Sequence, residues 1–363
     1  MSVTRRQFAP AAASLAALAA TAPAFAQQTN EIVKWRLVSS YPKSLDTLWG
    51  AATTITRIVG ELTDGKFQLQ PFGAGEIVPG LQVLDAAANA TVECGHTYGG
   101  YYIGKNPAFI FDASLPFGMT PRQHNAWMMY GDGRKLMDEV YDSFGVVALP
   151  AGNTGGQMFG WFRKELKTPA DFQGLKMRTA GFGGKVMAKL GAVPQQIAGG
   201  DIYPALERGT IDACEWVGPY DDEKLGFNKV AKYYYTPGVM ELEAVNQIVV
   251  NKAAWASLPP RYQAALCYAG MYVMTDMMAS YDAKNAQAIA RLVASGTLLS
   301  VLPEEVIKAL RVALETVLDE EAAQSEQFKK ILTNWRQFRA DQHRWFSIAD
   351  TRADLAVFRS DPR

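Results

Sequence analysis

The sequence predicts an α/β fold of two α/β units in series, joined by hinge strands and followed by a long helical C-terminal region. Short apolar runs alternate with amphipathic segments from Lys34 onward, and the same rhythm starts again after Gly152. This order is typical of a parallel, doubly wound sheet with helices on both faces. Residues 151–156 are rich in glycine and form a candidate hinge between the two units.

Each expected element follows from the spacing of apolar residues, with a period of two in strands and 3.6 in helices. The strand 244–250 comes too late to extend the second unit simply, so it is expected to cross back to the first sheet. The expected strands are 34–39, 67–72, 93–97, 158–163, 175–178, 193–198, 211–216 and 244–250, and the expected helices are 45–62, 79–88, 183–190, 203–207 and 304–319. The expected division is lobe I (31–152), lobe II (153–238), a return to lobe I (239–280), a return to lobe II (281–320) and a C-terminal helical extension (321–363).

The first 26 residues have the composition of an export signal. Residues 4–8 contain paired arginines, the apolar run 11–22 is shorter than the roughly 20 residues that span a bilayer, and 24–26 is a small-x-small cleavage site. The arginine pair resembles a twin-arginine signal, and an ordinary secretory signal is the alternative. Both predict an exported, periplasmic protein.

Composition excludes several functions. Lys plus Arg equals Asp plus Glu, 36 each, so the chain has no electrostatic footprint for nucleic acid. The three histidines lack zinc-ligand spacing, and the three cysteines allow at most one disulfide, with buried free thiols favoured. The glycine pairs 183–184 and 199–200 lack the Walker lysine, and Cys214 has no neighbouring histidine. The sequence thus favours a binding protein over an enzyme.

Candidate binding residues stand near expected strand ends. Arg178 ends the strand 175–178 beside a glycine turn and a helix start, a position from which a guanidinium can clamp a carboxylate. A surface salt bridge is the alternative. Gln157, Glu215 and Glu241 offer the oxygen ligands that sodium or calcium prefers, although glutamates near turns are mostly solvated. Glu215 adjoins Trp216, which sets a carboxylate beside a flat apolar face.

At these residues the chain resembles the extracytoplasmic substrate-binding proteins of tripartite ATP-independent periplasmic (TRAP) transporters. The closest branch binds 2-oxo or 2-hydroxy monocarboxylates together with a metal ion. The resemblance covers nearly the whole mature chain and rests on the segments Gly75 to Gly80, Gly152 to Gln157, Gly160 to Lys164, Leu175 to Arg178, Pro194 to Leu206 and Glu215 to Asp222.

The resemblance implies a periplasmic binding protein-like fold whose two lobes close around the ligand. It implies that TRAP membrane permease subunits are partners, and that Arg178 pairs with the ligand carboxylate. It places the metal between Gln157, Glu215, the Trp216 main-chain oxygen and Glu241. The expected ligand-contacting residues are Arg178, Gln157, Trp216, Tyr98, Tyr101, Phe182 and Asn153.

Charge counting favours calcium over sodium as the metal. Glu215, Glu241 and a ligand carboxylate bring three negative charges, and Arg178 brings one positive charge. The enclosed site would then carry −2 without metal, −1 with sodium and 0 with calcium. Burying uncompensated charge costs several kcal/mol.

Three positions depart from the family pattern. Val239 replaces a frequent aromatic residue, Tyr98 stands where a small residue is usual, and Gly100 replaces a tyrosine. These changes predict a reshaped pocket for an acid bulkier than pyruvate. A sensory module for the same acids and an exported metal-dependent 2-oxo acid enzyme are the alternative functions.

The C-terminal segment carries many bulky rings, namely Phe328, Trp335, Phe338 and Trp345. One interpretation is a helix packed on its own domain. The other is the interface of a homodimer.

Overall fold

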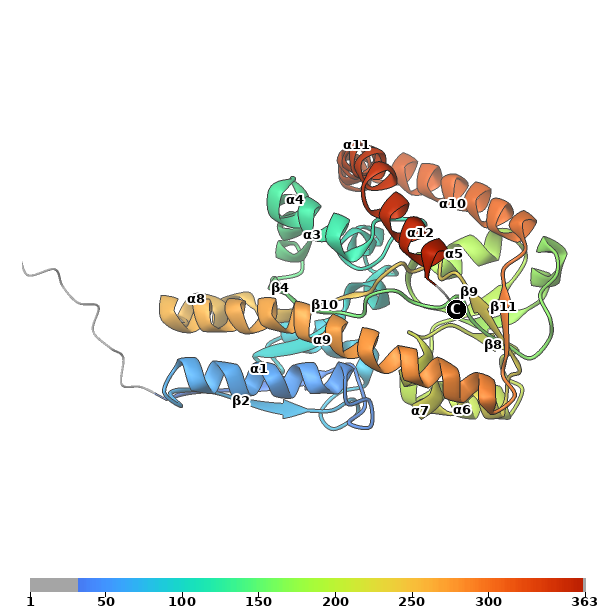
Figure 1. Ribbon diagram of the computed structural model, residues 1–363. Helices are drawn as coiled ribbons and strands as arrows, with labels where there is room; N and C mark the ends of the chain where they lie inside the picture. Colours follow the sequence, from blue (N-terminus) through green and yellow to red (C-terminus); the bar gives the residue numbers. More distant parts are fainter. Residues whose placement is uncertain (1–31, 362–363) are drawn as a thin grey trace, which may run out of the picture. The chain divides into compact units, whose positions relative to one another are not determined.

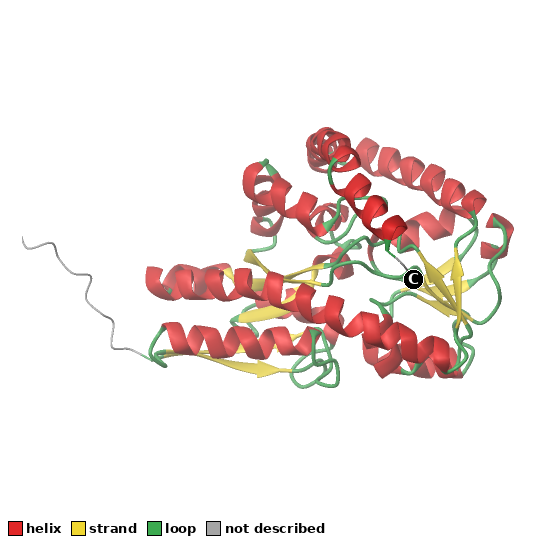
Figure 2. Ribbon diagram, viewed as in Figure 1, coloured by secondary structure: helices red, strands yellow, loops and turns green. Residues whose placement is uncertain are grey.

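Two β-sheets organise residues 32–361, the part of the chain that the computed structural model describes (Figure 1). The expected signal segment 1–26 lies outside these residues. Sheet A has the order β2-β1-β3-β10-β4 and sheet B the order β11-β9-β5-β8-β6-β7. Figure 2 shows the two groups of strands with helices around them. We call sheet A with its helices lobe I and sheet B with its helices lobe II; the expected α/β fold with two units is confirmed.

Each sheet combines strands from separate parts of the chain. Sheet A consists of β1 (Val33–Ser39), β2 (Phe67–Phe72), β3 (Cys94–Tyr98), β4 (Val146–Asn153) and β10 (Val245–Asn251). Sheet B consists of β5 (Gly160–Phe162), β6 (Lys176–Arg178), β7 (Val193–Gln195), β8 (Ala213–Cys214), β9 (Tyr233–Thr236) and β11 (Leu298–Val301). The α-helices are α1 (Leu48–Leu62), α2 (Val83–Ala88), α3 (Pro121–Tyr130), α4 (Gly133–Asp142), α5 (Gly181–Lys189), α6 (Gly199–Glu207), α7 (Pro219–Leu225), α8 (Lys252–Ser257), α9 (Pro260–Ala294), α10 (Glu304–Gln324), α11 (Glu326–Ile348) and α12 (Asp350–Ser360).

The sheets are mixed, so the prediction of parallel sheets is wrong. β10 pairs antiparallel with both β3 and β4, while β1, β2 and β3 are parallel. β10 is antiparallel to β4 because the chain leaves lobe I and re-enters it at the same end of sheet A. β4 leaves sheet A at Asn153 and β10 enters it beside that residue at Val245, so the outgoing and returning strands run in opposite directions. The expected return of strand 244–250 to the first sheet is confirmed.

Buried apolar residues explain why these strands form. Every residue of β10 is buried, as expected for a central strand covered on both faces. The sequence prediction missed the helices α3, α4 and α7 and the strands β4 and β11. The start of α3 nevertheless carries a local signal, since Thr120 and Gln123 form a capping box and Pro121 occupies the first turn.

Two long helices hold the lobes together. α9 packs against α1 and β4 of lobe I and against α7 of lobe II. On α11, the Phe328 ring stacks on Phe182 of α5 at 5.8 Å and lies 4.9 Å from the Phe111 ring of lobe I. The first half of α11 is therefore packed on its own chain, whereas Trp345 in the second half is 59% exposed.

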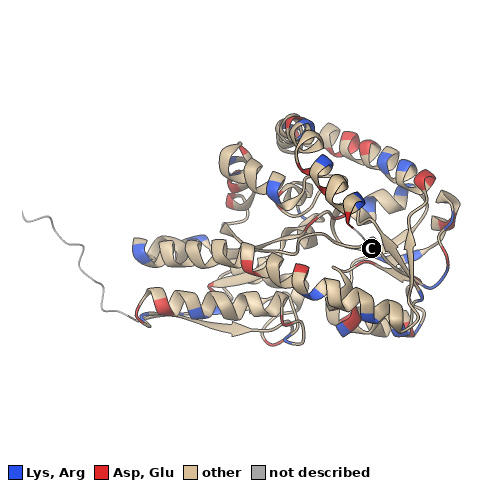
Figure 3. Ribbon diagram, viewed as in Figure 1, with Lys and Arg blue, Asp and Glu red and all other residues tan. Residues whose placement is uncertain are grey.

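The charged surface residues and the three cysteines give no sign of a special site. Basic and acidic residues are interspersed over the helices (Figure 3). No helix among residues 32–361 has the length and apolar character needed to cross a bilayer. The expected free thiols are confirmed, with Cys94 and Cys214 buried and Cys267 half-buried.

Candidate functional site

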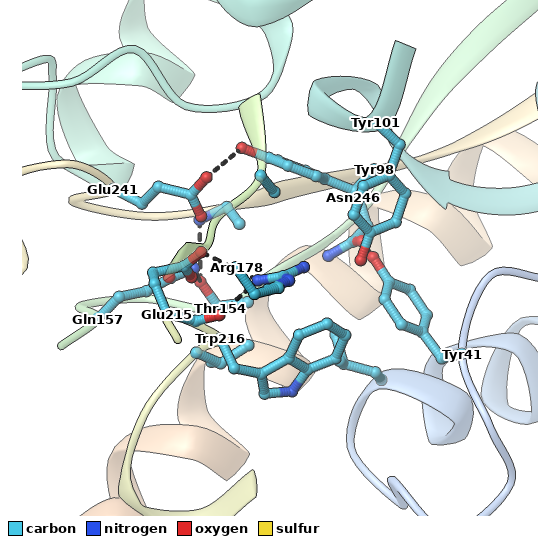
Figure 4. A pocket seen from close by; sticks show the side chains of 14 residues that line it. Tyr41, Tyr98, Tyr101, Thr154, Gln157, Arg178, Glu215, Trp216, Glu241 and Asn246 are labelled. Carbon is cyan, nitrogen blue, oxygen red and sulfur yellow. Dashed lines mark hydrogen bonds and ion pairs between the residues drawn. The ribbon is translucent and has the colours of Figure 1, made fainter. Parts of the chain in front are cut away.

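A small buried cavity lies where the strand ends of both lobes meet (Figure 4). Its volume of about 20 Å³ is room for about one water molecule. Lobe I contributes Tyr41, Tyr98 and Tyr101, and lobe II contributes Gln157, Arg178 and Glu215. The full lining is Tyr41, Leu48, Tyr98, Tyr101, Thr154, Gln157, Arg178, Ala180, Glu215, Trp216, Val217, Glu241, Ala244 and Asn246.

Arg178 presents an anion-binding group to this cavity. The side chain is 1% exposed and ends β6, as the sequence predicts. Its Nε donates to the Ile197 carbonyl oxygen at 3.2 Å, and Nη1 donates to Glu215 Oε2 at 3.0 Å and to the Glu215 carbonyl oxygen. The guanidinium also lies 4.8 Å from the Trp216 ring centroid. Nη2 has no hydrogen-bond partner among residues 32–361, so its two N–H groups are the ones available to a ligand carboxylate.

Three oxygen-bearing groups face one another beside Arg178. With Gln157 Nε2 donating to Thr154 Oγ1 at 2.9 Å, the amide oxygen faces the Trp216 carbonyl oxygen at 3.2 Å and Glu241 Oε2 at 3.3 Å. Turning the amide over would place a donor there instead. In that orientation Nε2 donates to both oxygens, whereas in the first orientation the amide oxygen is free to join them as a ligand of a cation.

Glu215 completes an oxygen set that suits a hard cation. Its Oε1 is buried and has no hydrogen-bond partner among the described residues. Two carboxylates, an amide oxygen and a main-chain oxygen are the donors that sodium and calcium prefer. Residues 32–361 contain no group of three or more His, Cys, Asp or Glu side chains placed to hold a metal. The oxygen set is no exception to this, because only Glu215 and Glu241 in it are side chains of these four types. Its other two donors are the Gln157 amide oxygen and the Trp216 main-chain oxygen.

The two carboxyl groups strongly resist ionisation without a compensating charge. Burial raises the pKa of Glu215 to about 7, and the nearby charge of Arg178 opposes this shift. Burial, and then the charge of Glu215, raise the pKa of Glu241 well above its usual value. Tyr98 donates its hydroxyl proton to Glu241 Oε1 at 2.8 Å and partly offsets that cost.

Aromatic rings form the lobe I wall of the cavity. The Tyr98 and Tyr101 rings meet edge to face at 5.3 Å, and Tyr41 donates to Asn246 Oδ1. A Cβ atom at Gly100 would lie 2.2 Å from Tyr98 Cε1. The glycine at 100 therefore leaves the space that the Tyr98 ring occupies.

Three residues that the sequence analysis singled out lie away from the cavity. Asn153 turns its side chain to Glu243, with Nδ2 donating to Oε2 at 2.6 Å, because Oδ1 is held by the Gly155 N–H. Phe182 is fully buried against Phe328. Val239 lines a different hollow, beside α11, so its smaller side chain does not enlarge the ligand cavity.

Several lining residues were missed by sequence reasoning. Tyr41 stands two residues after the end of β1, and the rule that strand carboxyl ends face ligands would have found it. Asn246 is one of three polar residues in the fully buried strand β10, with Gln247 and Asn251, and a buried polar residue is a signal that sequence reasoning could have used. Leu48, Thr154, Ala180, Val217 and Ala244 carry no such signal.

Known proteins resemble the chain over almost its whole length. Residues 38–325 match the sequence model of DctP, described as bacterial extracellular solute-binding protein, family 7. A monocarboxylate 2-oxoacid-binding periplasmic protein from Nostoc is 47% identical over 313 residues, 86% of each chain.

Two solved structures match both the fold and the sequence. A TRAP transporter solute-binding protein from Bordetella bronchiseptica, a mixed-occupancy dimer with copurified calcium and picolinate in one active site, has a TM-score of 0.90. It is 49% identical, over 91% of this chain and 98% of its own. A TRAP periplasmic solute-binding protein from Pseudoalteromonas atlantica, with bound sodium and pyruvate, has a TM-score of 0.87 and 36% identity, over 92% and 100% of the chains.

Proposed function

The chain belongs to the DctP family of TRAP solute-binding proteins, and from this premise we propose that it captures a 2-oxo or 2-hydroxy monocarboxylate with a metal ion. The loaded protein would deliver the acid to membrane permease subunits. The observation that carries this proposal is that Arg178 Nη2, which has no hydrogen-bond partner among residues 32–361, lines one buried cavity with the oxygen-bearing groups of Gln157, Glu215, Trp216 and Glu241. This pairing matches an acid that carries a carboxylate and an adjacent oxygen.

Each residue would have a defined role in capture. Nη2 of Arg178 would take the ligand carboxylate, and the Trp216 indole supports the guanidinium from its face. Gln157, Glu215, the Trp216 main-chain oxygen and Glu241 would hold the metal, which supplies a positive charge for the adjacent ligand oxygen. Tyr98 would orient Glu241. Closure of the lobes would exclude water and strengthen these contacts.

We propose calcium in preference to sodium. Both carboxyl groups of the site are almost fully buried, with residue exposures of 2% for Glu215 and 6% for Glu241. With Arg178 and an anionic ligand, only a divalent ion brings the site to neutrality. The relatives support a metal of either charge, since one holds calcium and the other sodium.

We propose that the natural acid is bulkier than pyruvate. The support is the contact between Tyr98 and Gly100, since a Cβ atom at Gly100 would lie 2.2 Å from Tyr98 Cε1 and the glycine thus leaves room for this ring in the cavity wall. The Bordetella relative, at 49% identity, holds picolinate, a ring-containing acid. Closed lobes leave about 20 Å³, so entry of any acid would require the lobes to separate.

Export and assembly complete the proposal. Family membership supports a periplasmic location, and we propose the twin-arginine route because of Arg5 and Arg6. Replacing both with lysine would abolish export if this route is used, whereas normal export would contradict it.

We also propose a homodimer through the exposed second half of α11 and α12, where Trp345, Ile348 and Phe358 are each more than half exposed. A monomer by light scattering at micromolar concentration would contradict the dimer.

Analysis of the copurified ligand tests the proposed function. The purified protein is denatured, and the released small molecules and metals are identified by mass spectrometry. One 2-oxo or 2-hydroxy acid and one metal ion per chain, unchanged chemically after prolonged incubation, are expected. A dicarboxylate, a sugar or a converted product would contradict the proposal.

A further inference from the structure

Glu241 lies in the connection between β9 of lobe II and β10 of lobe I, and lobe I holds this connection at two points. The Glu241 carboxylate accepts the Tyr98 hydroxyl (Figure 4). The backbone is held separately, because the Phe117 N–H donates to the Val239 carbonyl oxygen at 2.7 Å. Within the described part of the chain, no other backbone hydrogen bond joins residues 237–242 to a different segment. The path of the backbone two residues before Glu241 therefore depends on Phe117.

Phe117 has a backbone conformation that a bulky residue rarely adopts. Its φ angle is 51°, in the left-handed region. The next residue, Gly118, lies in a tight turn, since a Cβ atom there would be 2.4 Å from the Leu115 carbonyl oxygen and 3.3 Å from Trp335 Cζ2. A residue in this region costs energy and persists only where its surroundings determine it. Contacts from outside the turn are therefore needed to hold Phe117.

Two arginines from the C-terminal helices α10 and α11 supply such contacts (Figure 1). Nε of Arg339, on α11, donates to the Phe117 carbonyl oxygen at 2.9 Å. The guanidinium carbon of Arg311, on α10, lies 5.5 Å from the centroid of the Phe117 ring. One guanidinium thus holds the carbonyl group of Phe117, and the other faces its ring.

Arg339 differs from a neighbouring arginine of the same helix because it has no acidic partner. Arg336 forms ion pairs with Glu315 and Asp319, whereas Arg339 forms none within the described part of the chain. Arg339 is half-buried, and burial lowers its pKa to about 10, so the guanidinium is still charged at neutral pH. Because a partly buried charge needs polar partners, the Phe117 carbonyl oxygen is the contact that compensates for its burial.

We propose that Arg339 is a positioning residue for the metal site, and that it acts through Phe117 on the backbone that carries Glu241. This role rests on the proposed function of Glu241 as a metal ligand. Without the Arg339 donor, Phe117 can relax to an ordinary φ angle and turn its N–H away from Val239. Glu241 would then occupy more than one position. Groups that orient metal ligands in this way set the affinity for the metal.

Amide hydrogen exchange on refolded, metal-free protein tests the contact without any ligand. Arg339→Ala is expected to speed exchange of the Phe117 amide by about tenfold, the effect of one hydrogen bond. Arg336→Ala, the same change on the same helix, is the matched control and should leave this amide unchanged. Arg339→Lys keeps a charged donor and should restore slow exchange. Equal exchange of the Phe117 amide in Arg339→Ala and the unsubstituted protein would overturn the proposal.

Calcium affinity at saturating pyruvate separates positioning from a purely structural role. Arg339→Ala is expected to weaken calcium binding by about three- to tenfold, because it acts on the ligand through one intervening residue. Arg339→Lys should restore most of the affinity, Arg336→Ala should not change it, and Glu241→Gln should lower it more than Arg339→Ala does. A lower unfolding temperature of Arg339→Ala with unchanged calcium affinity would overturn the proposal, because the role would then be structural only.

Glu241→Gln also distinguishes failure of this role from failure of the proposed function. If Glu241→Gln weakens calcium binding and Arg339→Ala does not, the positioning role is wrong and the metal site stands. If neither variant weakens calcium binding, the metal site is itself wrong, and the positioning role is overturned with it.

Discussion

Replacing Arg178 with lysine tests the anion-binding group directly. The guanidinium makes three hydrogen bonds inside the protein, to Ile197 and Glu215, and leaves Nη2 for a ligand. A lysine ammonium is a single point charge on a flexible stem. It keeps the positive charge but has no separate nitrogen for each of these partners.

The expected loss of ligand-binding free energy follows from the hydrogen bonds of Arg178 that a lysine cannot make. Hydrogen bonds that involve a charged group contribute about 1.5–3 kcal/mol each. If the ammonium turns to the ligand, the Glu215 and Ile197 carbonyl oxygens lose donors. If it stays with them, the ligand carboxylate loses its donor pair. Since the charge is retained, we expect a net loss of about 2–3 kcal/mol, or about 30- to 150-fold in Kd.

The assay is calorimetry with pyruvate at saturating calcium, on protein unfolded and refolded to remove bound acid. Arg163→Lys is the matched control, because Arg163 is an exposed lobe II arginine outside the cavity. Circular dichroism shows whether Arg178→Lys is folded. A folded Arg178→Lys protein that binds pyruvate within about threefold of the unsubstituted protein would refute the role given to the guanidinium.

Three further predictions concern the cavity wall, a buried carboxyl group and the helix that joins the lobes. Gly100→Ala should weaken ligand binding in the unsubstituted protein but much less in Tyr98→Ser, because the added Cβ clashes with the Tyr98 ring. A coupling below about 0.5 kcal/mol in this cycle would contradict the shared space. Burial raises the pKa of Asp222 to about 7, so its contribution to stability is lost as pH rises from about 4 through 7. Asp222→Asn should therefore gain on the order of 2–4 kcal/mol relative to the unsubstituted protein between pH 4 and 8 in urea denaturation, and a constant difference would refute this. Phe328→Ala should cost about 3–5 kcal/mol of unfolding free energy, since Phe328 is fully buried against rings of both lobes. Tyr130→Ala, at a 90% exposed position, is its control and should change stability by less than about 0.5 kcal/mol.

Local patterns in the sequence were sufficient for much of the fold. The expected strand 67–72 has the bounds of β2, and the helix expected from residue 304 begins there. Strand direction was not predictable in the same way. Whether β10 runs parallel or antiparallel depends on where the chain re-enters sheet A, which is a property of the crossing and not of its apolar residues.

Family resemblance was needed to predict that residues far apart in the sequence come together in one site. Spacing alone identified Arg178 and the glutamates as candidates, but not that Glu241 and Glu215 share a cavity. Asn153 and Phe182 show the limit of this reasoning. Both adjoin the right glycine-rich segments, yet the first turns to Glu243 and the second to Phe328. Side-chain direction depends on tertiary neighbours that a linear pattern does not contain.

Metal dependence of acid binding is the most direct test of the central claim. Refolded, ligand-free protein is titrated with pyruvate in three buffers, which contain calcium, sodium with a calcium chelator, or neither metal with the chelator. Arg178 and the oxygen set act together in the proposed site, so tight one-to-one binding that requires a metal, and is tightest with calcium, is the predicted result. Equal affinity in all three buffers would contradict the account, because the buried pair of Glu215 and Glu241 would then accept an anion without a cation between them.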